Sequence, residues 1–477
     1  MPVRFGPMHP EEFRRHGHTM VDWMADYLAG VAELPITPDV APGQIRRAIP
    51  SAPPTAGEPF EILFRDFREL IVPGMTHWNH PGWFAYFPCN NSPPSILAEM
   101  LTSAIGAQCM SWATSPAATE LEQVVLDWLR QMIGLPPRFV GVIQDTASTA
   151  TLVALLSARE RATGGAAGAE GLSGGPALAV YASAEAHSSV DKAAKLAGYG
   201  LARLRRIATD QNFALRPELL ERALAEDIRA GIRPACVVAS VGTTSSTAID
   251  PVPAIAEICE QHGVWLHVDA AYAGPAAIVP ELRWILDGVA RADSVVLNPH
   301  KWMLTNFDCT AYYVREPAAL LSAFQTSPEY LRTAYDPEVV NFRDWGIQLG
   351  RRFRALKLWF VLRSYGVEGL QALIRRHVAL AHELEGWIRQ EPDFEVMAPV
   401  PLGLVCFRYY PEGLGDAEAD DLNRRLLERV NVSRRVFLTH TRLGGRYAIR
   451  LVVGQRTTER HHVEEAWRLV RDAAGQL

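Results

Sequence analysis

The sequence has little of several features that would assign it to a specialised class of protein. It contains six cysteines in 477 residues and no C-x-x-C pair, which excludes a disulfide-dense scaffold and favours a reducing compartment. No stretch approaches the ~20 uninterrupted apolar residues that a membrane-spanning helix needs, and the N-terminal residues lack the apolar core of a signal peptide. The net charge is only −6, without a Lys/Arg-rich tail. We therefore expect a cytoplasmic protein that binds neither a membrane nor nucleic acid.

The composition is that of a folded globular protein. Hydrophobic residues make up 48% of the chain and charged residues 21%, which leaves little room for extended disorder. A chain of this length exceeds one ordinary core, so we expect two or three domains. Apolar residues recur at helical spacing between residues 9 and 34, and a second helical stretch covers residues 60–71. These stretches predict an N-terminal helical segment, residues 1–85, that packs on a partner subunit.

The middle of the chain alternates β-rich runs with helical stretches. Runs of this kind cover residues 178–182, 236–241, 265–269 and 294–297, and the alternation predicts a large α/β domain with a mainly parallel sheet flanked by helices. We assign it residues 86–370, with residues 164–176 as a surface loop. A long helix beginning near residue 375, followed by β-rich runs at 404–409 and 447–453, predicts a small α+β C-terminal domain over residues 371–477.

The segment Asn298–Trp302 carries the first candidate for chemistry. Lys301 follows a β-rich run and stands between an imidazole and an indole. A buried amine has a lowered pKa and becomes nucleophilic, as a lysine must be to condense with an aldehyde cofactor. A lysine that snorkels at a strand end is the alternative, and we would favour it for an isolated lysine.

Asp269 supplies a second candidate. It ends the β-rich run 265–269 and precedes small residues, and an aspartate at the carboxyl end of a strand can face a ligand crevice. A carboxylate beside the pyridine nitrogen of pyridoxal phosphate keeps that nitrogen protonated, which makes the ring an electron sink. Alone, Asp269 would be a turn or cap residue; together with Lys301 it favours this cofactor.

Two further stretches could contact such a cofactor. Small hydroxyl residues at 146–149 open a helix whose free amides suit a phosphate, although an N-cap alone would use the same residues. His187 follows the run 178–182 and could stack on the pyridine ring, although a lone histidine is often structural. A metal site built from His262, His267 and Asp269 lacks familiar ligand spacing, so we expect no metal.

Seven stretches of the chain resemble one known family over nearly the whole length. They are residues 76–81, 84–88, 111–116, 187–190, 267–274, 298–302 and 349–354. In this order they resemble the group II pyridoxal-phosphate-dependent decarboxylases, and within them the aromatic L-amino-acid decarboxylases. The resemblance implies the fold type I architecture of PLP-dependent transferases, pyridoxal 5'-phosphate as cofactor, and a homodimer with active sites at its interface.

The same matching implies roles for individual residues. Lys301 corresponds to the Schiff-base lysine, Asp269 to the partner of the pyridine nitrogen, and His187 to the residue that stacks on the ring. Further cofactor contacts are implied at Ala147, Ser148, Thr244, Ala271, Asn298 and His300. The substrate pocket is implied at Trp78, Tyr86, Phe87, Cys89, His187 and Gly350, with Met110 approaching from the partner chain.

The activity implied is decarboxylation of an aromatic L-amino acid, namely tryptophan, tyrosine, phenylalanine or 3,4-dihydroxyphenylalanine, to an arylalkylamine and carbon dioxide. Residues 327–339 match the family's mobile catalytic loop, in which Tyr330 would protonate the substrate carbon with His187 as a relay. Tyr330 could otherwise pack on the surface. An aldehyde-forming relative, which typically carries phenylalanine at this position, is the alternative activity. A non-catalytic PLP-binding regulator would need a DNA-binding or partner module.

The sequence departs from the family's pattern near two of these contacts. Asp145 and Thr149 stand where glycine and glutamate are common, which affects the expected phosphate contacts. Cys89 stands where threonine is frequent, and Asn90 replaces a small residue beside it. We therefore expect the substrate contacts of this chain to differ from those of its relatives.

Overall fold

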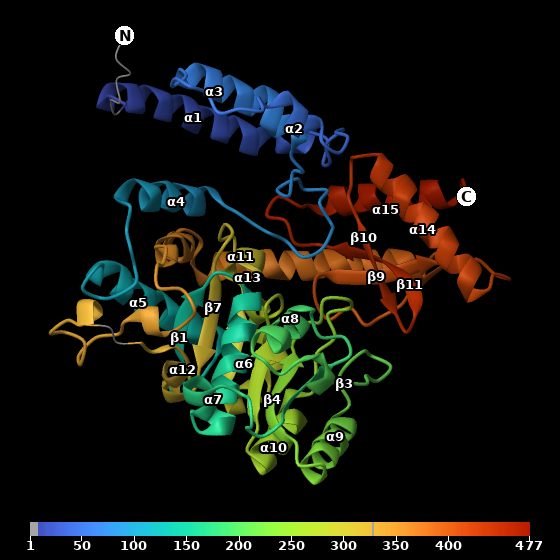
Figure 1. The fold of residues 1–477 in the computed structure, drawn as a ribbon. Coiled ribbons are helices and arrows are strands. Elements are labelled where there is room, and N and C mark those ends of the chain that lie inside the picture. Colours follow the sequence, from blue (N-terminus) through green and yellow to red (C-terminus); the bar gives the residue numbers. More distant parts are fainter. Residues whose placement is uncertain (1–7, 327–328) are drawn as a thin grey trace.

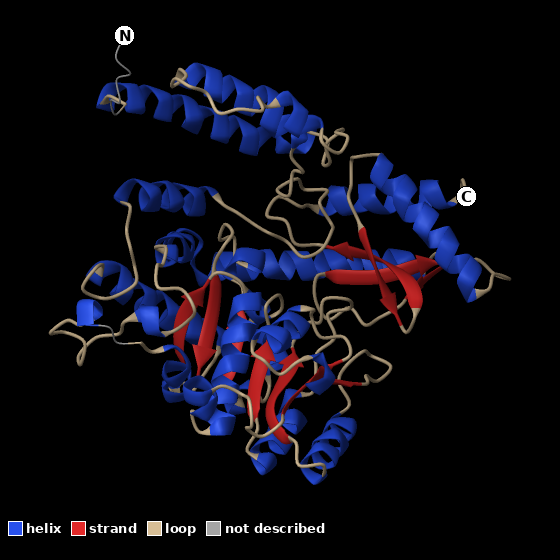
Figure 2. Ribbon diagram, viewed as in Figure 1, coloured by secondary structure: helices blue, strands red, loops and turns tan. Residues whose placement is uncertain are grey.

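The structure, a computed structural model, describes residues 8–326 and 329–477, and its centre is a seven-stranded sheet (Figures 1 and 2). The strands are β1 Val140–Gln144, β2 Leu178–Ser183, β3 Leu204–Ile207, β4 Arg233–Ser240, β5 Trp265–Asp269, β6 Ser294–Leu297 and β7 Thr310–Val314. They lie in the order β1-β7-β6-β5-β4-β2-β3. The pairs among β2 to β6 are parallel, and β7 runs antiparallel to both β1 and β6. This mainly parallel sheet confirms the fold class expected from the sequence.

Both faces of the sheet are buried, which explains the continuous apolar runs. Val237 belongs to a cluster with Leu129 on one face, whereas the next residue, Val238, packs with Leu155 on the other. The helices beside the sheet include α5 Pro116–Ile133, α6 Ala147–Thr163, α8 Ser189–Leu196, α9 Pro217–Arg229, α10 Val252–His262 and α12 Pro317–Phe324. Residues 164–176, expected as a loop, contain the five-residue helix α7 Ala166–Glu170, so that prediction was wrong at its centre.

A second, smaller sheet is antiparallel throughout. It contains β8 Phe394–Val396, β9 Leu404–Tyr409, β10 Thr439–Leu443 and β11 Arg446–Val452 in the order β10-β11-β9-β8, with α14 Asp416–Val432 and α15 Arg460–Ala474 packed on it. Helix α13 Arg354–Arg389 leads to it from the large sheet. This helix begins 21 residues before the expected start near residue 375, and Gly366 breaks it at φ 64° and ψ 176°.

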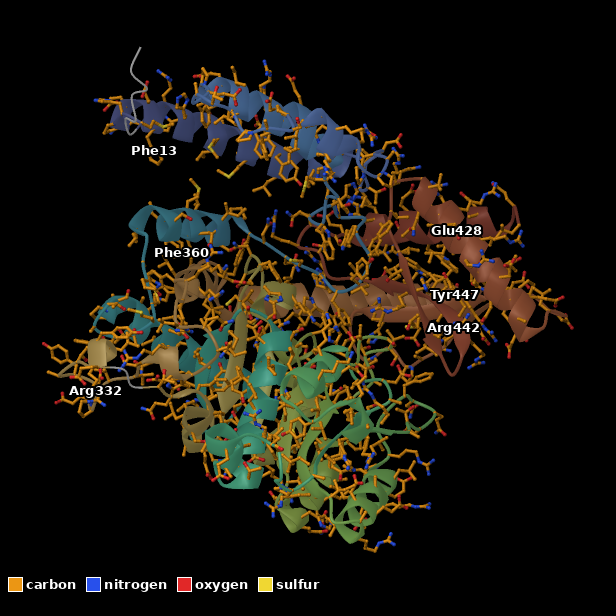
Figure 3. All side chains as sticks on the ribbon, in the orientation of Figure 1. Phe13, Arg332, Phe360, Glu428, Arg442 and Tyr447 are labelled. Carbon is orange, nitrogen blue, oxygen red and sulfur yellow. The ribbon has the colours of Figure 1, made fainter. Side chains whose placement is uncertain are left out.

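The N-terminal helices lie beside each other at the edge of the molecule (Figure 1). They are α1 Pro10–Gly30, α2 Gln44–Ala48 and α3 Phe60–Asp66, and the rings of His16 and Phe60 stack at 4.1 Å between α1 and α3. Phe13 of α1, labelled in Figure 3, is 67% exposed. Helix α4 Pro93–Ile105 follows, and residue 84 joins the small sheet through Val452 N–H to Phe84 O at 2.9 Å. No helix among the described residues is both long and apolar enough to span a bilayer.

Candidate active site

A cavity of about 220 Å³ opens where β4, β5 and β6 end. The carboxyl ends of parallel strands meet at one edge of a sheet, so residues that follow different strands come together there. Nine residues expected to contact the cofactor line this cavity: Ala147, Ser148, His187, Thr244, Asp269, Ala271, Asn298, His300 and Lys301. Thr146, from the hydroxyl stretch 146–149, also lines it, whereas sequence reasoning missed Ser240, Gly242, Thr243 and Tyr272. Three of these follow or end β4, so the same strand-end rule could have found them.

Lys301 lies on the short helix α11 Pro299–Trp302, between the end of β6 and the loop to β7. Burial lowers the pKa of its amine below the ordinary lysine value, and the negative charge of Asp269 opposes this shift. Its Nζ lies 5.4 Å from the centre of the Phe87 ring. The lysine therefore presents an amine that loses its proton more readily than a surface lysine does, as a nucleophile requires.

Asp269 ends β5 and is 9% exposed. Its Oδ1 accepts a hydrogen bond from Ala271 N–H at 3.1 Å, which fixes the orientation of the carboxylate. The same carboxylate acts on the pKa values of both Lys301 and His187, raising each against the effect of burial. One acidic group thus faces two bases within a single cavity.

The two histidines of the cavity share one tautomer. Ser189 N–H donates to Nδ1 of His187 at 3.1 Å, and Cys309 N–H donates to Nδ1 of His300 at 3.0 Å. Because both Nδ1 atoms accept, the ring proton of each neutral histidine is assigned to Nε2. Burial lowers the pKa of His187 and brings that of His300 to about 3. Each ring is therefore held neutral with an Nε2–H donor.

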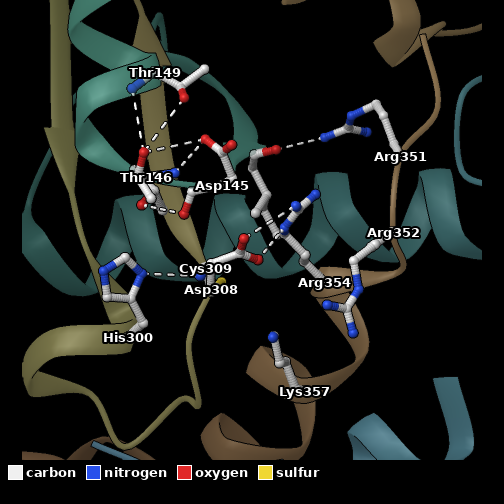
Figure 4. Close-up of polar contacts among 12 residues, drawn as sticks. Asp145, Thr146, Thr149, His300, Asp308, Cys309, Arg351, Arg352, Arg354 and Lys357 are labelled. Carbon is white, nitrogen blue, oxygen red and sulfur yellow. Dashed lines mark hydrogen bonds and ion pairs between the residues drawn. The ribbon is translucent and has the colours of Figure 1, made fainter. Parts of the chain in front are cut away.

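The start of α6 provides donors for an anion. Thr146 caps the helix by accepting a hydrogen bond from Thr149 N–H at 3.4 Å, so the departure at residue 149 takes part in the cap (Figure 4). Within the part of the chain that the structure describes, the N–H groups of Ala147 and Ser148 donate to no acceptor. Free amides at a helix N-terminus bind phosphate well. Asp145 accepts from Thr146 N–H and places a carboxylate near this position.

Ion pairs and hydrogen bonds lie beside His300, one of the residues that line the cavity (Figure 4). Arg354 donates to Asp308 at 2.7 Å, next to the Cys309 amide that holds His300. Lys357, a second buried lysine, lies 3.0 Å from Glu99, and burial lowers its pKa to about 8. Lys357 does not line the cavity, so Lys301 is the lysine placed for chemistry with a ligand there.

The residues expected in the substrate pocket are only partly brought together. Phe87 lines the cavity. The rings of Trp78 and Tyr86 stack on each other at 5.6 Å outside it, and both are exposed. Cys89 is half-buried; burial raises the pKa of its thiol and the charge of Lys301 opposes that shift. Phe87 thus lines the cavity, whereas the stacked rings of Trp78 and Tyr86 do not.

Three other expected residues lie outside the cavity of the same chain. Met110 O accepts from Arg343 N–H at 2.8 Å, and a side chain at Gly350 would meet Gln108 at 3.2 Å. Tyr330 is 79% exposed in the turn Glu329–Leu331. Arg332 marks this loop at the outer edge of the molecule in Figure 3. The first loop residues, 327 and 328, lie outside the described residues.

The metal-binding alternative has no support from geometry. Nδ1 of His267 lies 2.9 Å from Ser294 Oγ inside the sheet, whereas His262 is exposed at the end of α10. In residues 8–326 and 329–477 no group of three or more His, Cys, Asp or Glu side chains is arranged to hold a metal ion.

Comparison with known proteins defines the family. Residues 42–410 match the model of the pyridoxal-dependent decarboxylase conserved domain. Aromatic-L-amino-acid decarboxylase of Sus scrofa is 46% identical over 484 residues, covering 98% of each chain. Phenylacetaldehyde synthase of Arabidopsis thaliana is 44% identical over 481 residues, covering 99% of this chain and 97% of the relative. The solved structure of Oryza sativa TDC with PLP and tryptamine has a TM-score of 0.96 and 41% identity, covering 99% of each chain.

The chain belongs to the pyridoxal-dependent decarboxylases. This confirms the family, the fold type I architecture and the cofactor expected from the sequence. The cavity fits pyridoxal phosphate, because it combines a buried amine of lowered pKa, a carboxylate, a neutral imidazole and the free amides of α6. Lys301, Asp269, His187 and the Ala147–Ser148 amides are the groups that would hold it.

Proposed function

We propose that this enzyme decarboxylates an aromatic L-amino acid to the corresponding arylalkylamine and carbon dioxide. The observation that carries the proposal is the cavity in which Lys301, Asp269 and His187 meet beside the ring of Phe87. An aromatic wall favours an aromatic side chain through ring contacts. The Sus scrofa relative is named for decarboxylation of aromatic amino acids, and the Oryza sativa structure contains the amine tryptamine.

Some residues of the chain would bind the cofactor, and others would transfer protons. Bound pyridoxal phosphate accepts the electron pair left when the bond from Cα to the carboxylate breaks. Lys301 would hold the cofactor, and Asp269 would keep its ring nitrogen protonated. His187, whose Nε2–H is available as a donor, would stack on the ring. The ring of Phe87 would shield the substrate carboxylate from water, which favours loss of the carboxylate because the charge disperses as the bond breaks.

Tyr330 is the proposed proton donor to the substrate carbon, with His187 as relay. The side chain of Tyr330 is exposed and does not line the cavity of its own chain, so it must reach a cavity in another way. A homodimer would supply one, because Tyr330 and Gly350 lie outside the cavity of their own chain and Met110 is expected to approach from the partner chain. A loop of one subunit would complete the cavity of the other.

Exposed apolar side chains support the homodimer. Helix α4 exposes Leu97, Met100, Leu101 and Ile105, which repeat at helical spacing, and Phe13 is exposed on α1. A row of exposed apolar side chains on one helix is typical of an interaction surface. The six cysteines are free thiols, which supports the proposed cytoplasmic location.

An assay of the loaded enzyme tests the proposal. We expect L-tryptophan, L-tyrosine, L-phenylalanine or 3,4-dihydroxy-L-phenylalanine to yield carbon dioxide and amine in equal amounts, and Lys301→Ala to yield neither. Tyr330→Phe should release aldehyde or lose turnover, which separates the amine-forming reaction from the alternative represented by phenylacetaldehyde synthase. If no aromatic amino acid loses carbon dioxide while Lys301 still binds the cofactor, the substrate proposal fails and the cofactor assignment stands.

A further inference from the structure

Asn90, one of the departures from the family's pattern, lies at a junction of three segments. Its side chain is 1% exposed. Its Nδ2 donates to Lys301 O at 2.9 Å and to Gly454 O at 2.7 Å, and its Oδ1 accepts from Arg456 N–H at 3.1 Å. One amide therefore ties the backbone of the cofactor lysine to the turn that follows β11 in the small sheet.

A second polar link joins the neighbouring residue to the same turn. Trp302 Nε1–H donates to Nδ1 of His377 at 2.9 Å, and Nε2 of His377 lies 3.0 Å from Gln455 O. Since Nδ1 accepts from an indole, Nε2 must carry the proton and donate to the carbonyl. Burial brings the pKa of His377 to about 3, so the ring stays neutral and keeps both bonds near neutral pH.

Close packing leaves little freedom between these segments. A Cβ atom at Gly454 would meet Pro88 Cγ at 2.7 Å, and one at Gly403 would meet Val453 O at 2.6 Å. Both distances are shorter than ordinary van der Waals contacts. The turn 454–456 thus lies directly against the segment that carries Asn90, and Gly403 packs between Val453, which precedes the turn, and the ring of Trp302.

We propose that Asn90 and His377 are positioning residues that fix Lys301 by tying α11 to the turn 454–456 of the small sheet. The two links start on consecutive residues, Lys301 and Trp302, and end on the consecutive residues Gly454, Gln455 and Arg456. Two points of attachment prevent α11 from pivoting about one bond. The small sheet, which supplies no residue to the cavity lining, therefore controls how deeply the amine of Lys301 is held. This inference rests on the proposed function only in taking Lys301 as the cofactor lysine.

The test measures Lys301 directly. The sequence contains four lysines, Lys192, Lys195, Lys301 and Lys357, so acetylation of each by trace acetic anhydride can be followed against pH by mass spectrometry. In the full-length protein without PLP, we expect Asn90→Ala to move the titration of Lys301 upward toward that of exposed Lys195, because a loosened α11 admits water. With PLP and substrate, kcat should fall about tenfold with KM changed by less than about twofold, as for loss of one buried hydrogen-bond donor.

Three further variants make the test decisive. Asn90→Asp is nearly isosteric and keeps the acceptor for Arg456 but loses donation to both carbonyls, so it should act like Asn90→Ala. Asn91→Ala removes the adjacent half-buried amide and should leave the Lys301 titration unchanged. His377→Leu should shift the titration in the same direction as Asn90→Ala. A folded Asn90→Ala protein, judged by thermal melting, with wild-type Lys301 titration would overturn the proposal. That outcome is independent of the proposed function, which Lys301→Ala tests.

Discussion

At the scale of single residues, the cavity combines one carboxylic acid with three bases whose pKa values are lowered by burial. Asp269 carries the acidic group, whereas burial favours the uncharged forms of Lys301, His187 and His300. The cavity contains the Asp269 carboxylate, which would pair with the ring nitrogen of the cofactor, and the free amides of α6, which would bind its phosphate. The chemistry of the site thus depends more on burial than on the number of charged residues.

Asp269→Asn should retain the cofactor and lose most of the rate. The amide cannot stabilise a protonated ring nitrogen, so the electron sink weakens, and we expect kcat to fall about a hundredfold or more. The lysine-dependent absorbance of bound PLP should remain. Steady-state kinetics with the absorbance spectrum measure both, and Asp287→Asn, an exposed aspartate in a turn, is the matched control. Wild-type kcat in Asp269→Asn would show that another group protonates the ring.

At the scale of elements, the local sequence pattern predicted the strands that carry the site. It did not predict the direction of β7 or the contacts between distant segments. The runs 265–269 and 294–297 match β5 and β6 residue for residue, because buried parallel strands read as continuous apolar stretches. The antiparallel direction of β7 has no such signature, since it depends on the route of the loop from α11. The link from Trp302 through His377 to Gln455 joins positions far apart in sequence, so no spacing rule could reveal it.

The break in α13 at Gly366 is a second feature that the local sequence pattern did not predict. Gly366 has φ 64° and ψ 176°, a region that only glycine occupies without strain. Gly366→Ala should lower the free energy of unfolding by about 1–3 kcal/mol. Gly386 lies in the same helix with open space around it, and Gly386→Ala should stabilise by up to about 1 kcal/mol. Denaturant titration compares the two; equal effects would show that α13 tolerates a continuous helix at residue 366.

At the scale of the whole molecule, buried histidines make stability depend on pH. The folded-state pKa is about 4 for His80 and His267 and about 3 for His300 and His377, against 6.5 for an ordinary histidine. Between these values the unfolded chain binds more protons than the folded one, so acidification below about pH 6.5 favours unfolding. We expect the free energy of unfolding to fall steadily from pH 6.5 to pH 4.

The variant His267→Leu removes one of these histidines and, with it, the proton that the histidine binds on unfolding. The side chain is fully buried, and its Nε2 has no hydrogen-bond partner among the described residues. The variant should flatten the dependence of unfolding free energy on pH by up to about 1.4 kcal/mol per pH unit, the value of one proton. Urea titrations across this range measure the slope, and an unchanged slope would mean that His267 titrates normally in the folded protein.

The proposed homodimer belongs to the same scale. It would account for Tyr330 and Gly350, which lie outside the cavity of their own chain, and for Met110, which the family resemblance assigns to the partner. The pattern of residues indicates which residues serve a site but not which copy supplies them, and only the family resemblance assigned Met110 to the partner. Ile105→Asp places a charge in the exposed apolar stripe of α4 and should shift the protein toward a single chain in sedimentation, with loss of turnover. Leu196→Asp, an equally exposed change on α8, should do neither. An active single chain would remove the partner from the mechanism.

The ring stack beneath the cavity has an optical consequence. Phe87 and Tyr272, which both line the cavity, stack on each other at 3.8 Å, and Tyr272 stacks on Trp302 at 4.7 Å, so one indole lies directly behind the cavity lining and beside the cofactor lysine. Tryptophan emission overlaps the absorption of lysine-bound pyridoxal phosphate, and energy transfer weakens steeply with separation. Of the twelve tryptophans in the chain, Trp302 is the one adjacent in sequence to Lys301. We expect binding of the cofactor to quench the emission of Trp302, so tryptophan fluorescence would report cofactor loading without substrate or label.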